Sequence, residues 1–363
     1  MAVRQAEDQQ ALRGSLPYNA PSMPKKVRWG VLGAARIAIS KVIPATQRSA
    51  WAEVTAIASR DKARAKAVAD QLGIPKAYGS YEELIADPDV DAVYNPLPNH
   101  LHLPWSLKAA AAGKHVLCEK PIGLNAKEAE RLIAARDEHG VLIQEAFMIR
   151  THPQWLTVVD LVRSGRIGEV RSVVGTFSFT LTDPANVRTV AEWGGGGLLD
   201  LGCYLVQTAR WILNREPERV VAAMEIDPHT RIDRLASMIL DFAPLSRDLG
   251  PVHVIGTCSM YQTNYQRIQV LGTAGRIEIE IPFNAPLTGP SRILITDGSD
   301  GTGTAADVMT IPTCNQYTLQ ADRFSRAILG EADLALPLED SFANMRVIDA
   351  LFESAKTGRW ERP

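Results

Sequence analysis

Cysteine is scarce in this sequence of 363 residues, which contains four, at Cys118, Cys203, Cys258 and Cys314. No two of them form a C-x-x-C pair, so the sequence predicts neither a zinc site nor a redox pair, and we expect no metal. Scarce cysteine is typical of a reducing compartment, which favours a cytoplasmic location. No apolar run approaches the ~20 residues that a membrane helix needs, so no membrane partner is expected.

Neither sign of charge is in excess, since 39 Lys and Arg stand against 41 Asp and Glu, for a net charge of −2 at pH 7. Proteins that bind nucleic acid or an anionic membrane usually carry a basic excess. We therefore expect small-molecule partners and no nucleic acid. The hydrophobic content of 46% is typical of globular proteins, and the length is sufficient for about two domains.

Residues 1–26 lack the apolar core of a signal peptide and a twin-arginine pair, so we expect no export. They contain Pro17, Pro21 and Pro24, and two interpretations remain open. The segment is either a disordered tail or an extended N-terminal arm. Prolines favour the arm because they keep the chain extended and lower the entropy cost of docking on a surface.

From residue 27 to 150, short apolar strands alternate with helical segments. The predicted strands are residues 27–32, 51–58, 91–95, 115–118 and 141–149. Strands that alternate with helices form a parallel sheet with helices on both faces. The sequence therefore predicts an α/β fold whose first domain, residues 27–150, is a doubly wound Rossmann sheet.

A glycine turn follows the first predicted strand and opens a helix. Strand, glycine turn and helix form the layout that binds dinucleotides, with the pyrophosphate over the helix N-terminus. Alanine replaces two glycines of the G-x-G-x-x-G pattern, and its single methyl group still leaves room for close approach of the backbone. The predicted cofactor contacts in this turn are Gly33, Ala34, Ala35, Arg36 and Ile37.

The second predicted strand ends in Ser59-Arg60, where NAD sites usually carry an acidic residue. A carboxylate would repel the 2′-phosphate of NADP. Ser59 can donate a hydrogen bond, and Arg60 and Arg64 can pair with phosphate oxygens. We therefore predict NADP as the cofactor; the alternative is a basic turn that faces solvent.

A proline-rich loop, residues 96–102, follows the third predicted strand. At the carboxyl end of a parallel strand, such a loop can cover the nicotinamide ribose. The predicted contacts are Leu97, Pro98, Asn99 and His102. Metal binding by His100 and His102 is disfavoured, because no carboxylate or third histidine lies close in the sequence.

The strand at residues 115–118 ends abruptly in Glu119-Lys120-Pro121. Ligands of open α/β sheets sit at this end of a strand. Lys120 is therefore a candidate for proton chemistry or for holding a reacting oxygen, and Pro121 makes a cis peptide bond feasible. The alternative is a solvated Glu-Lys pair at a strand end.

The second domain, residues 151–363, has a different pattern, with a run of strands separated by turns and little helix between them. This pattern predicts an α+β domain with a large, mostly antiparallel, open-faced sheet. The open face is available for packing against another subunit, which favours a homo-oligomer. The last helices, predicted near residues 317–329 and 341–357, can pack back on the first domain.

Four glycines, residues 194–197, precede a predicted helix that carries Asp200 and Tyr204. The spacing of four places both side chains on one helical face. We expect Asp200 to orient Lys120 and hold it charged, and the ammonium to lower the pKa of the Tyr204 phenol, which then exchanges protons with a substrate. The alternative is an ordinary helix with an acidic first turn and a half-buried tyrosine.

Three motifs together resemble the Gfo/Idh/MocA oxidoreductases: Gly33-x-Ala35-x-x-Ala38, Glu119-Lys120-Pro121, and the glycine run with Asp200-x-Gly202-x-Tyr204. The resemblance extends from Val27 over nearly the whole chain. Many members have histidine at the position of Tyr204, and tyrosine there is similar to the glucose–fructose and aldose–aldose oxidoreductase types.

The resemblance implies an NADP-dependent oxidoreductase that oxidises a cyclic aldose at C1 to an aldonolactone. It also implies a tightly bound NADP(H) on which a second sugar is reduced to its alditol, with the N-terminal arm over the cofactor. Two alternatives remain open, a dissociable NADP-dependent sugar or trans-dihydrodiol dehydrogenase and a non-catalytic cofactor-sensing regulator.

The site residues that follow fall into three groups. The catalytic residues are Lys120, Asp200 and Tyr204. The further predicted cofactor contacts are Glu119, Lys120, Arg188, Trp193 and Tyr317. The predicted substrate contacts are Lys120, Arg150, His152, Asp200 and Tyr204.

Overall fold

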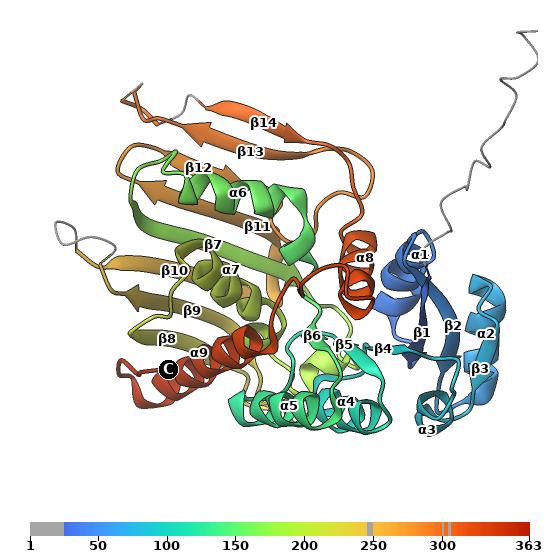
Figure 1. Cartoon of the computed structure of the whole chain (residues 1–363). Helices are drawn as coiled ribbons and strands as arrows, with labels where there is room; N and C mark the ends of the chain where they lie inside the picture. The colour runs from blue at the N-terminus through green and yellow to red at the C-terminus, as the bar shows by residue number, and fades with distance from the viewer. Residues whose placement is uncertain (1–24, 245–249, 300, 304–305) are drawn as a thin grey trace, which may run out of the picture.

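The computed structural model describes residues 25–244, 250–299, 301–303 and 306–363. The arm predicted at residues 1–26 lies, apart from its last two residues, outside the described residues. Figure 1 shows two units side by side, a smaller sheet of N-terminal strands and a larger sheet of C-terminal strands. Among the described residues, no helix combines the length and the apolar character that crossing a membrane requires.

The smaller sheet confirms the predicted parallel α/β architecture. In the described part of the chain it has six strands in the order β3-β2-β1-β4-β5-β6, and every pair is parallel. The order reverses between β1 and β4, which places a ligand crevice at the carboxyl ends of these strands. The strands are β1 Val27–Leu32, β2 Ala52–Ala58, β3 Lys76–Tyr78, β4 Ala92–Asn95, β5 His115–Cys118 and β6 Ile143–Glu145.

Helices flank this sheet and are bounded by local signals. Asp61 accepts hydrogen bonds from two backbone N–H groups at the start of α2, and Gly73, at φ 68°, ends it. Asn125 is the N-cap of α5, where it accepts from the N–H of Glu128. The helices are α1 Ile43–Thr46 after a π turn at Ala38–Val42, α2 Lys62–Leu72, α3 Tyr81–Ile85, α4 His102–Ala111 and α5 Ala126–His139.

The larger sheet has eight strands in the described residues, in the order β14-β13-β12-β11-β7-β10-β9-β8. Its pairs are antiparallel apart from β7 with β10, which run parallel. The mostly antiparallel sheet predicted for the second domain is therefore confirmed. The strands are β7 Val170–Thr180, β8 Arg219–Ile226, β9 Asp233–Phe242, β10 Val252–Ser259, β11 Tyr261–Gly272, β12 Arg276–Ile279, β13 Ser291–Thr296 and β14 Asp307–Ile311.

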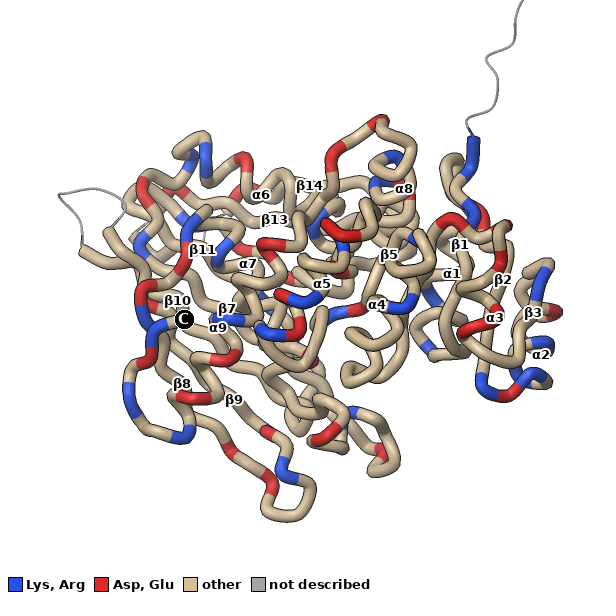
Figure 2. Tube along the Cα trace, turned by 60° about the horizontal axis from the view of Figure 1, so that its bottom comes forward, with Lys and Arg blue, Asp and Glu red and all other residues tan. Residues whose placement is uncertain are grey.

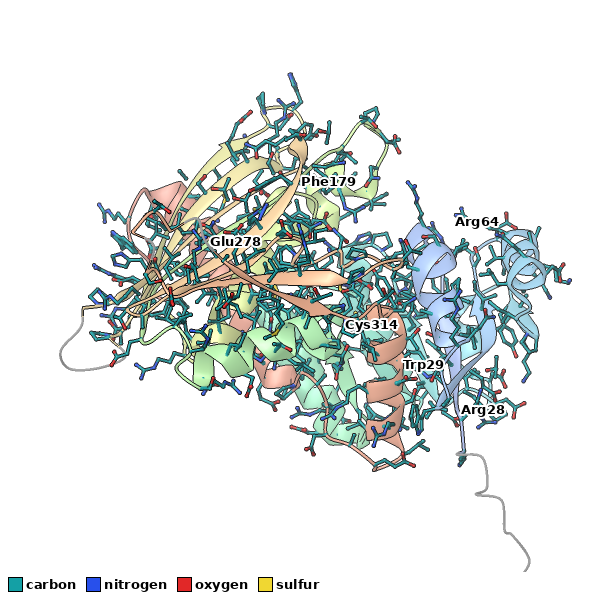
Figure 3. The ribbon with its side chains drawn as sticks, turned by 90° about the horizontal axis from the view of Figure 1, so that it is seen from above. Arg28, Trp29, Arg64, Phe179, Glu278 and Cys314 are labelled. Atoms are coloured by element: carbon teal, nitrogen blue, oxygen red, sulfur yellow. The ribbon has the colours of Figure 1, made fainter. Side chains whose placement is uncertain are left out.

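One face of the larger sheet is covered by α6 Pro153–Arg163, α7 Cys203–Leu213 and α9 Leu338–Thr357 (Figure 1). The opposite face carries no α-helix among the described residues (Figure 3). Side chains alternate accordingly: on β7, Val173 is buried and Val174 is 36% exposed, and on β10, Val254 is buried and Ile255 is 46% exposed. The exposed face therefore presents aliphatic side chains.

Helix α8, Gln316–Ile328, joins the two units, although it lies almost 300 residues from β1 in the sequence. The Trp29 indole donates to Ser325 Oγ at 3.1 Å and packs edge-on against Phe324. Figure 3 shows Trp29 beside this helix. Helix α9 is also tied to α5, where Arg136 pairs with Glu339 at 2.7 Å. The late helices thus pack on the first unit and hold the two sheets in a fixed relation.

Charged residues of both signs are interspersed over both units, as Figure 2 shows. Oppositely charged side chains form pairs such as Arg28–Asp91 and Lys108–Glu82. In this view, the described residues form no large block of one charge sign that would attract a highly charged macromolecule.

Candidate active site

A cavity of about 1340 Å³ opens at the carboxyl ends of the parallel strands and extends to β7 and β11 of the larger sheet. Its walls hold most of the residues that the sequence singled out. The predicted residues that line it are Gly33, Ala34, Ala35, Arg36, Ile37, Ser59, Arg60, Arg64, Leu97, Pro98, Asn99, His102, Glu119, Lys120, Arg188, Trp193, Asp200, Tyr204 and Tyr317. The structure therefore brings strand ends and glycine segments that are up to 284 residues apart, from Gly33 to Tyr317, into one space.

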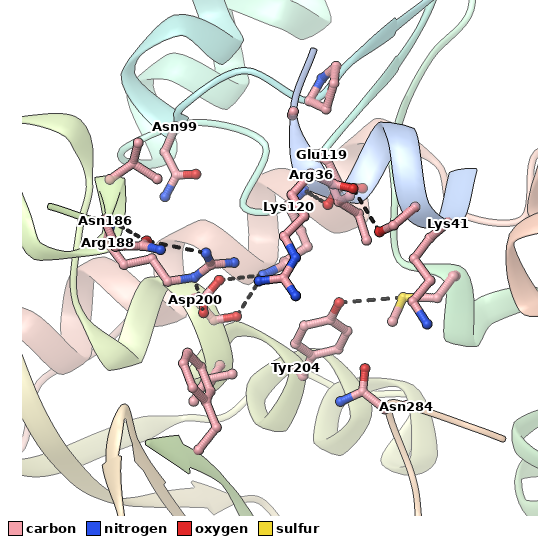
Figure 4. A pocket seen from close by; sticks show the side chains of 18 of the residues that line it. Arg36, Lys41, Asn99, Glu119, Lys120, Asn186, Arg188, Asp200, Tyr204 and Asn284 are labelled. Atoms are coloured by element: carbon pink, nitrogen blue, oxygen red, sulfur yellow. Dashed lines mark hydrogen bonds and ion pairs between the residues drawn. The ribbon is translucent and has the colours of Figure 1, made fainter. Parts of the chain in front are cut away.

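Lys120 follows β5, and its peptide bond to Pro121 is cis. Its ammonium donates to Asp200 Oδ1 at 2.7 Å and to the Asp200 carbonyl oxygen at 2.8 Å (Figure 4). Burial disfavours the charged ammonium, but the Asp200 carboxylate outweighs this effect and the pKa of Lys120 is raised. Lys120 is therefore a fixed cation at neutral pH, which confirms the expectation that Asp200 orients it and holds it charged.

Asp200 holds a second cation on its other oxygen. Arg188 Nε donates to Asp200 Oδ2 at 2.7 Å, and the Asp200 carboxylate raises the pKa of this guanidinium. Burial alone would raise the pKa of Asp200, yet the two cations together hold it far below its usual value. The chain Lys120–Asp200–Arg188 thus carries two positive charges and one negative charge inside the cavity.

Tyr204 lies beside this chain, with its ring enclosed by Phe147, Phe177 and Phe283 at centroid distances of 5.1, 5.7 and 5.1 Å. Its hydroxyl donates to Met148 Sδ at 3.4 Å, and Lys120 Nζ lies 5.3 Å from the ring centroid. Ammonium and phenol therefore border the same part of the cavity, close enough to contact one small molecule.

The predicted lowering of the Tyr204 pKa is wrong. Burial among aromatic rings, assisted by the Glu119 carboxylate, raises the pKa of Tyr204 well above its usual value. The ammonium of Lys120 does not compensate, because Asp200 neutralises most of its field. Tyr204 is consequently a protonated phenol at neutral pH.

The segment that carries Asp200 also differs from the predicted regular helix. Leu198–Gly202 forms a π turn, and α7 begins only at Cys203. Such turns insert a residue into a helix and occur frequently at functional sites. Here the turn directs Asp200 toward Lys120 while Tyr204, in the first turn of α7, also borders the cavity.

Glu119 is a buried carboxylate at the same strand end. Its Oε1 accepts a hydrogen bond from the Tyr94 hydroxyl at 2.7 Å, and its Oε2 accepts from the N–H of Lys120 at 3.3 Å. Burial raises the pKa of Glu119 in spite of the Lys120 charge. Its hydrogen bonds tie the strand end to β4 and stabilise the orientation of Lys120.

At the opposite end of the cavity, the glycine turn after β1 leaves its backbone open. Gly33 has φ 84°, and a Cβ added there would lie 2.8 Å from Leu97 Cδ2. Only glycine tolerates both the positive φ and the close approach. The turn therefore forms a cradle bounded by backbone N–H groups and the helix N-terminus, which is suited to a pyrophosphate.

Basic side chains gather where this turn faces the end of β2. Arg64 Nη2 donates to the Ala34 carbonyl oxygen at 3.0 Å, which joins α2 to the glycine turn. Ser59 and Arg60 line the same cavity. A cluster of cations and a hydroxyl in place of a carboxylate fits a dinucleotide that carries an extra phosphate.

The loop after β4 reaches the glycine run of the second unit. Asn99 Nδ2 donates to the Gly194 carbonyl oxygen at 2.8 Å, and His100 stacks on Trp193 at 5.3 Å. His102 requires a correction: it is fully buried, and its ring nitrogens lie 2.7 Å from the carbonyl oxygens of Leu97 and Pro121. It fixes the loop against the Lys120 corner and has no free nitrogen for a cofactor.

Arg150 and His152 do not reach the cavity, contrary to the predicted substrate contacts. Arg150 lies over the Trp211 ring at 4.2 Å and donates to the Ala335 carbonyl oxygen. His152 accepts from the N–H of Gln154 as the N-cap of α6. Arg150 therefore connects α7 with α9, where it also pairs with Asp340 at 3.5 Å, whereas His152 caps α6.

Several other residues line the cavity that no sequence motif indicated. They come from the π turn before α1, from α3, from the turn after β6, from β7 and the loop after it, from β11 and from the segment after β12. Nothing in the local sequence pattern shows which of these segments faces the site. These residues are Lys41, Tyr81, Met148, Phe177, Phe179, Asn186, Asn264, Gln266 and Asn284. Figure 4 labels Lys41, Asn186 and Asn284 among the side chains that line the cavity.

Known proteins resemble the chain over most of its length. Residues 27–147 match the model of an oxidoreductase family with an NAD-binding Rossmann fold, and residues 155–278 match the GFO/IDH/MocA C-terminal domain. The chain is 46% identical over 335 residues to an uncharacterised oxidoreductase of Rhizobium meliloti, covering 92% of this chain and 98% of that protein.

A second relative is the D-xylose 1-dehydrogenase (NADP(+)) 2 of Haloferax volcanii, 41% identical over 332 residues, or 91% of this chain and 98% of that protein. Among solved structures, aldose–aldose oxidoreductase from Caulobacter crescentus, complexed with glycerol, superimposes with a TM-score of 0.84 at 28% identity. That match covers 93% of this chain and 100% of the other. The fold, the site and these matches together show that the chain is an oxidoreductase of the Gfo/Idh/MocA family.

Proposed function

We propose that this oxidoreductase uses NADP to oxidise a cyclic aldose at C1 to an aldonolactone. The observation that carries the proposal is the meeting of Lys120, Asp200 and Tyr204 in one cavity that begins at the Gly33 turn. A cation and a phenol beside a dinucleotide cradle provide the groups that a carbinol–carbonyl interconversion requires.

The chain's residues fit the cofactor. The open backbone at Gly33 is suited to the pyrophosphate, and Ser59, Arg60 and Arg64 are suited to the 2′-phosphate that distinguishes NADP from NAD. When bound, the nicotinamide supplies the hydride acceptor and donor at C4. NADP is also in the name of the Haloferax relative, which supports this choice.

Lys120 stabilises negative charge on the reacting oxygen. Its pKa is raised, so it stays charged, and Asp200 keeps it in one position by accepting from it twice. An ammonium that is held before the substrate arrives needs no reorganisation during the reaction. In the reductive direction, the same cation polarises the carbonyl group of the substrate, which makes its carbon a better acceptor for hydride.

Tyr204 transfers the proton. As a protonated phenol it donates to the carbonyl oxygen in the reductive direction, and in the oxidative direction its phenolate form accepts the proton of the C1 hydroxyl. Phe177 and Phe283 exclude water around its ring. A positioned proton donor or acceptor of this kind contributes ~10²–10⁴-fold to the rate.

We further propose that a second sugar is reduced to its alditol on a cofactor that stays bound between the half-reactions. The support is the similarity over nearly the full length to a protein named aldose–aldose oxidoreductase. The alternative is a dehydrogenase that releases NADP after each turnover, as the name of the Haloferax relative would allow.

The test is a panel of aldoses, including D-xylose and D-glucose, offered with and without added NADP, while aldonolactone and alditol are both measured. Oxidation of at least one aldose to its lactone is expected, and inactivity on the whole panel with NADP or NAD would overturn the proposal. Denaturation of the purified protein, followed by an assay of the released NADP(H), then shows whether the cofactor was retained. A cofactor-free preparation that forms lactone only with added NADP refutes the proposal that the cofactor stays bound. It supports the alternative, a dehydrogenase that releases NADP after each turnover.

A further inference from the structure

Asp233 is a buried carboxylate that the reaction described above does not use. It begins β9, has 2% of its surface exposed and is not among the residues that line the cavity. Its Oδ2 accepts a hydrogen bond from the N–H of Leu198 at 2.6 Å. A carboxylate taken from water needs a specific reason to be retained, because burial without full compensation costs free energy.

The geometry around Asp233 is that of a cap on the segment 198–213. The free N–H groups and the positive end of the dipole at a helix start favour a carboxylate there. Burial raises the pKa of Asp233 to about 7, while the N–H groups of Leu198 and Gly197 act in the opposite direction. The cap comes from a strand 35 residues further along the chain, so no local motif reveals it.

Gly196 is adapted to this cap. Its φ is 116°, and a Cβ at this position would overlap Asp233 Oδ1. Oδ1 is buried and has no hydrogen-bond partner among the described residues. The backbone of the glycine run therefore packs directly on the carboxylate, and any side chain at Gly196 would displace it.

The cap is connected to the site through two short backbone links. Leu198 precedes Asp200 by two residues, and the N–H of Asp200 donates to the Gly196 carbonyl oxygen at 3.3 Å. Asp200 in turn presents both its carboxylate and its carbonyl oxygen to Lys120. A shift of the π turn would move both acceptors of the ammonium together.

We propose that Asp233 is a positioning residue that anchors the π turn Leu198–Gly202 and thereby holds Asp200 where it fixes Lys120. The role rests on the proposed function only for its effect on rate, since the anchor itself is a property of the fold. Displacement by about 1 Å at a catalytic group can cost on the order of 10²-fold in rate.

The experiment compares D233A and D233N with D241A. Asp241 lies on the same strand, is also buried and pairs with Arg219 on the far side from the cavity, so D241A controls for loss of a buried carboxylate on β9. D233A is expected to lower kcat for aldose oxidation by about 10- to 100-fold with little change in the Kd of NADP. D233N keeps an acceptor for Leu198 and is expected to retain kcat within a few-fold.

A second readout separates positioning from general destabilisation. When Asp200 is displaced, burial dominates at Lys120 and its pKa falls, so the alkaline loss of reductive activity in D233A should move to lower pH than in wild type. D241A should lose reductive activity at the same alkaline pH as the wild type. If D233A does not fold, D233S replaces it, because its hydroxyl is too short to reach Leu198. Full kcat in D233A or D233S, or equal losses in D233A and D241A, overturns the proposal.

A substrate-free measurement keeps the inference distinct from the proposed function. The melting temperatures of D233A, D200A and the double variant are compared. The decreases caused by the two single substitutions are expected not to add in the double variant, because Asp233 and Asp200 stabilise the same π turn. Strict additivity overturns the anchor even when every variant is active. Inactivity of the wild-type enzyme on all aldoses, with non-additive melting temperatures, would instead refute the proposed function and leave the anchor standing.

Discussion

Lys120 is the residue on which the proposed chemistry depends most, because it is a buried cation with two acceptors on a single partner. We predict that Lys120→Met lowers kcat/KM for aldose oxidation by about 10²–10⁴-fold, since methionine keeps the volume and removes the charge. Steady-state kinetics with saturating NADP measures the effect.

The matched control for this variant is Lys108→Met. Lys108 is half exposed, pairs with Glu82 on the surface and does not line the cavity, so its loss should leave the kinetics unchanged. A Lys120→Met enzyme as active as the control would show that the Lys120 ammonium does not contribute to the reaction.

The Tyr204 phenol determines the pH dependence that we expect. Its pKa is raised, so at neutral pH the phenolate that accepts a proton is the minor form and its population grows about tenfold per pH unit below the pKa. We predict that kcat/KM for aldose oxidation rises with pH to at least about pH 9, whereas reduction, which uses the protonated phenol, stays level across neutral pH. Profiles from pH 6 to 10 measure both directions.

Tyr204→Phe is the matched variant, because it keeps the ring packed among the aromatic side chains and removes the hydroxyl. It should lose about 10²–10⁴-fold in rate and show no pH-dependent rise from this group. An oxidation rate that levels off below pH 7 in the wild type would mean that the phenol titrates lower than its burial dictates.

At the scale of elements, the end of β2 decides the choice of cofactor. Ser59 and Arg60 connect the end of β2 to the N-terminus of α2. Arg64, in the first turn of α2, donates a hydrogen bond to a backbone carbonyl oxygen of the glycine turn. We predict that Arg60→Ala raises the Kd of NADP by about 10- to 100-fold and changes the Kd of NAD little, because a charge-assisted hydrogen bond contributes about 1.5–3 kcal/mol.

Fluorescence titration of NADPH and NADH measures these constants. Lys62→Ala is the control, since Lys62 is an exposed cation two residues after Arg60, at the start of α2, and does not line the cavity. Equal weakening of NADPH binding by the two variants would indicate a general effect of net charge. An unchanged preference for NADPH over NADH in Arg60→Ala would mean that other residues recognise the 2′-phosphate.

The elements that sequence patterns missed are the short or exposed ones. Lys76–Tyr78 has three half-buried residues and no alternation, and Asp307–Ile311 is exposed apart from its last residue. Both are edge strands that form because a neighbouring strand offers free hydrogen-bonding groups. These two strands are stabilised by pairing with a neighbouring strand, and the local sequence does not show which strands will be neighbours.

At the scale of the whole molecule, the exposed face of the larger sheet is the natural place for a second copy of the chain. Ile255 and Val174 are cross-strand partners and both are exposed on that face. We predict a homo-oligomer that Ile255→Lys converts toward monomers, because a buried ammonium without a partner is costly. Mass photometry measures the assembly.

Leu156→Lys is the control for this prediction. Leu156 is 48% exposed on α6, on the helix-covered side of the sheet, so the same chemical change there should leave the assembly intact. A monomeric wild-type protein, or dissociation by Leu156→Lys alone, would contradict assembly through the open face.

What the sequence by itself determined is the set of features that depend on neighbours along the chain. Strand–helix alternation, the Gly33 turn, the strand end at Lys120 and the spacing from Asp200 to Tyr204 follow from local periodicity and turn chemistry. The resemblance of these motifs to a known family connected them to nicotinamide chemistry, and the parallel and antiparallel sheets formed where the patterns predicted.

Only the tertiary structure decided the properties that depend on burial and on distant charges. Burial raises the pKa of Tyr204, and Arg150 packs on Trp211 while His152 caps α6, so that neither lines the cavity. His102 contacts two backbone carbonyl oxygens, and Asp233 accepts a hydrogen bond from the first residue of the π turn. The physical reason is that solvent exclusion and electrostatic pairing are set by groups far apart in the chain, whose meeting no local pattern encodes.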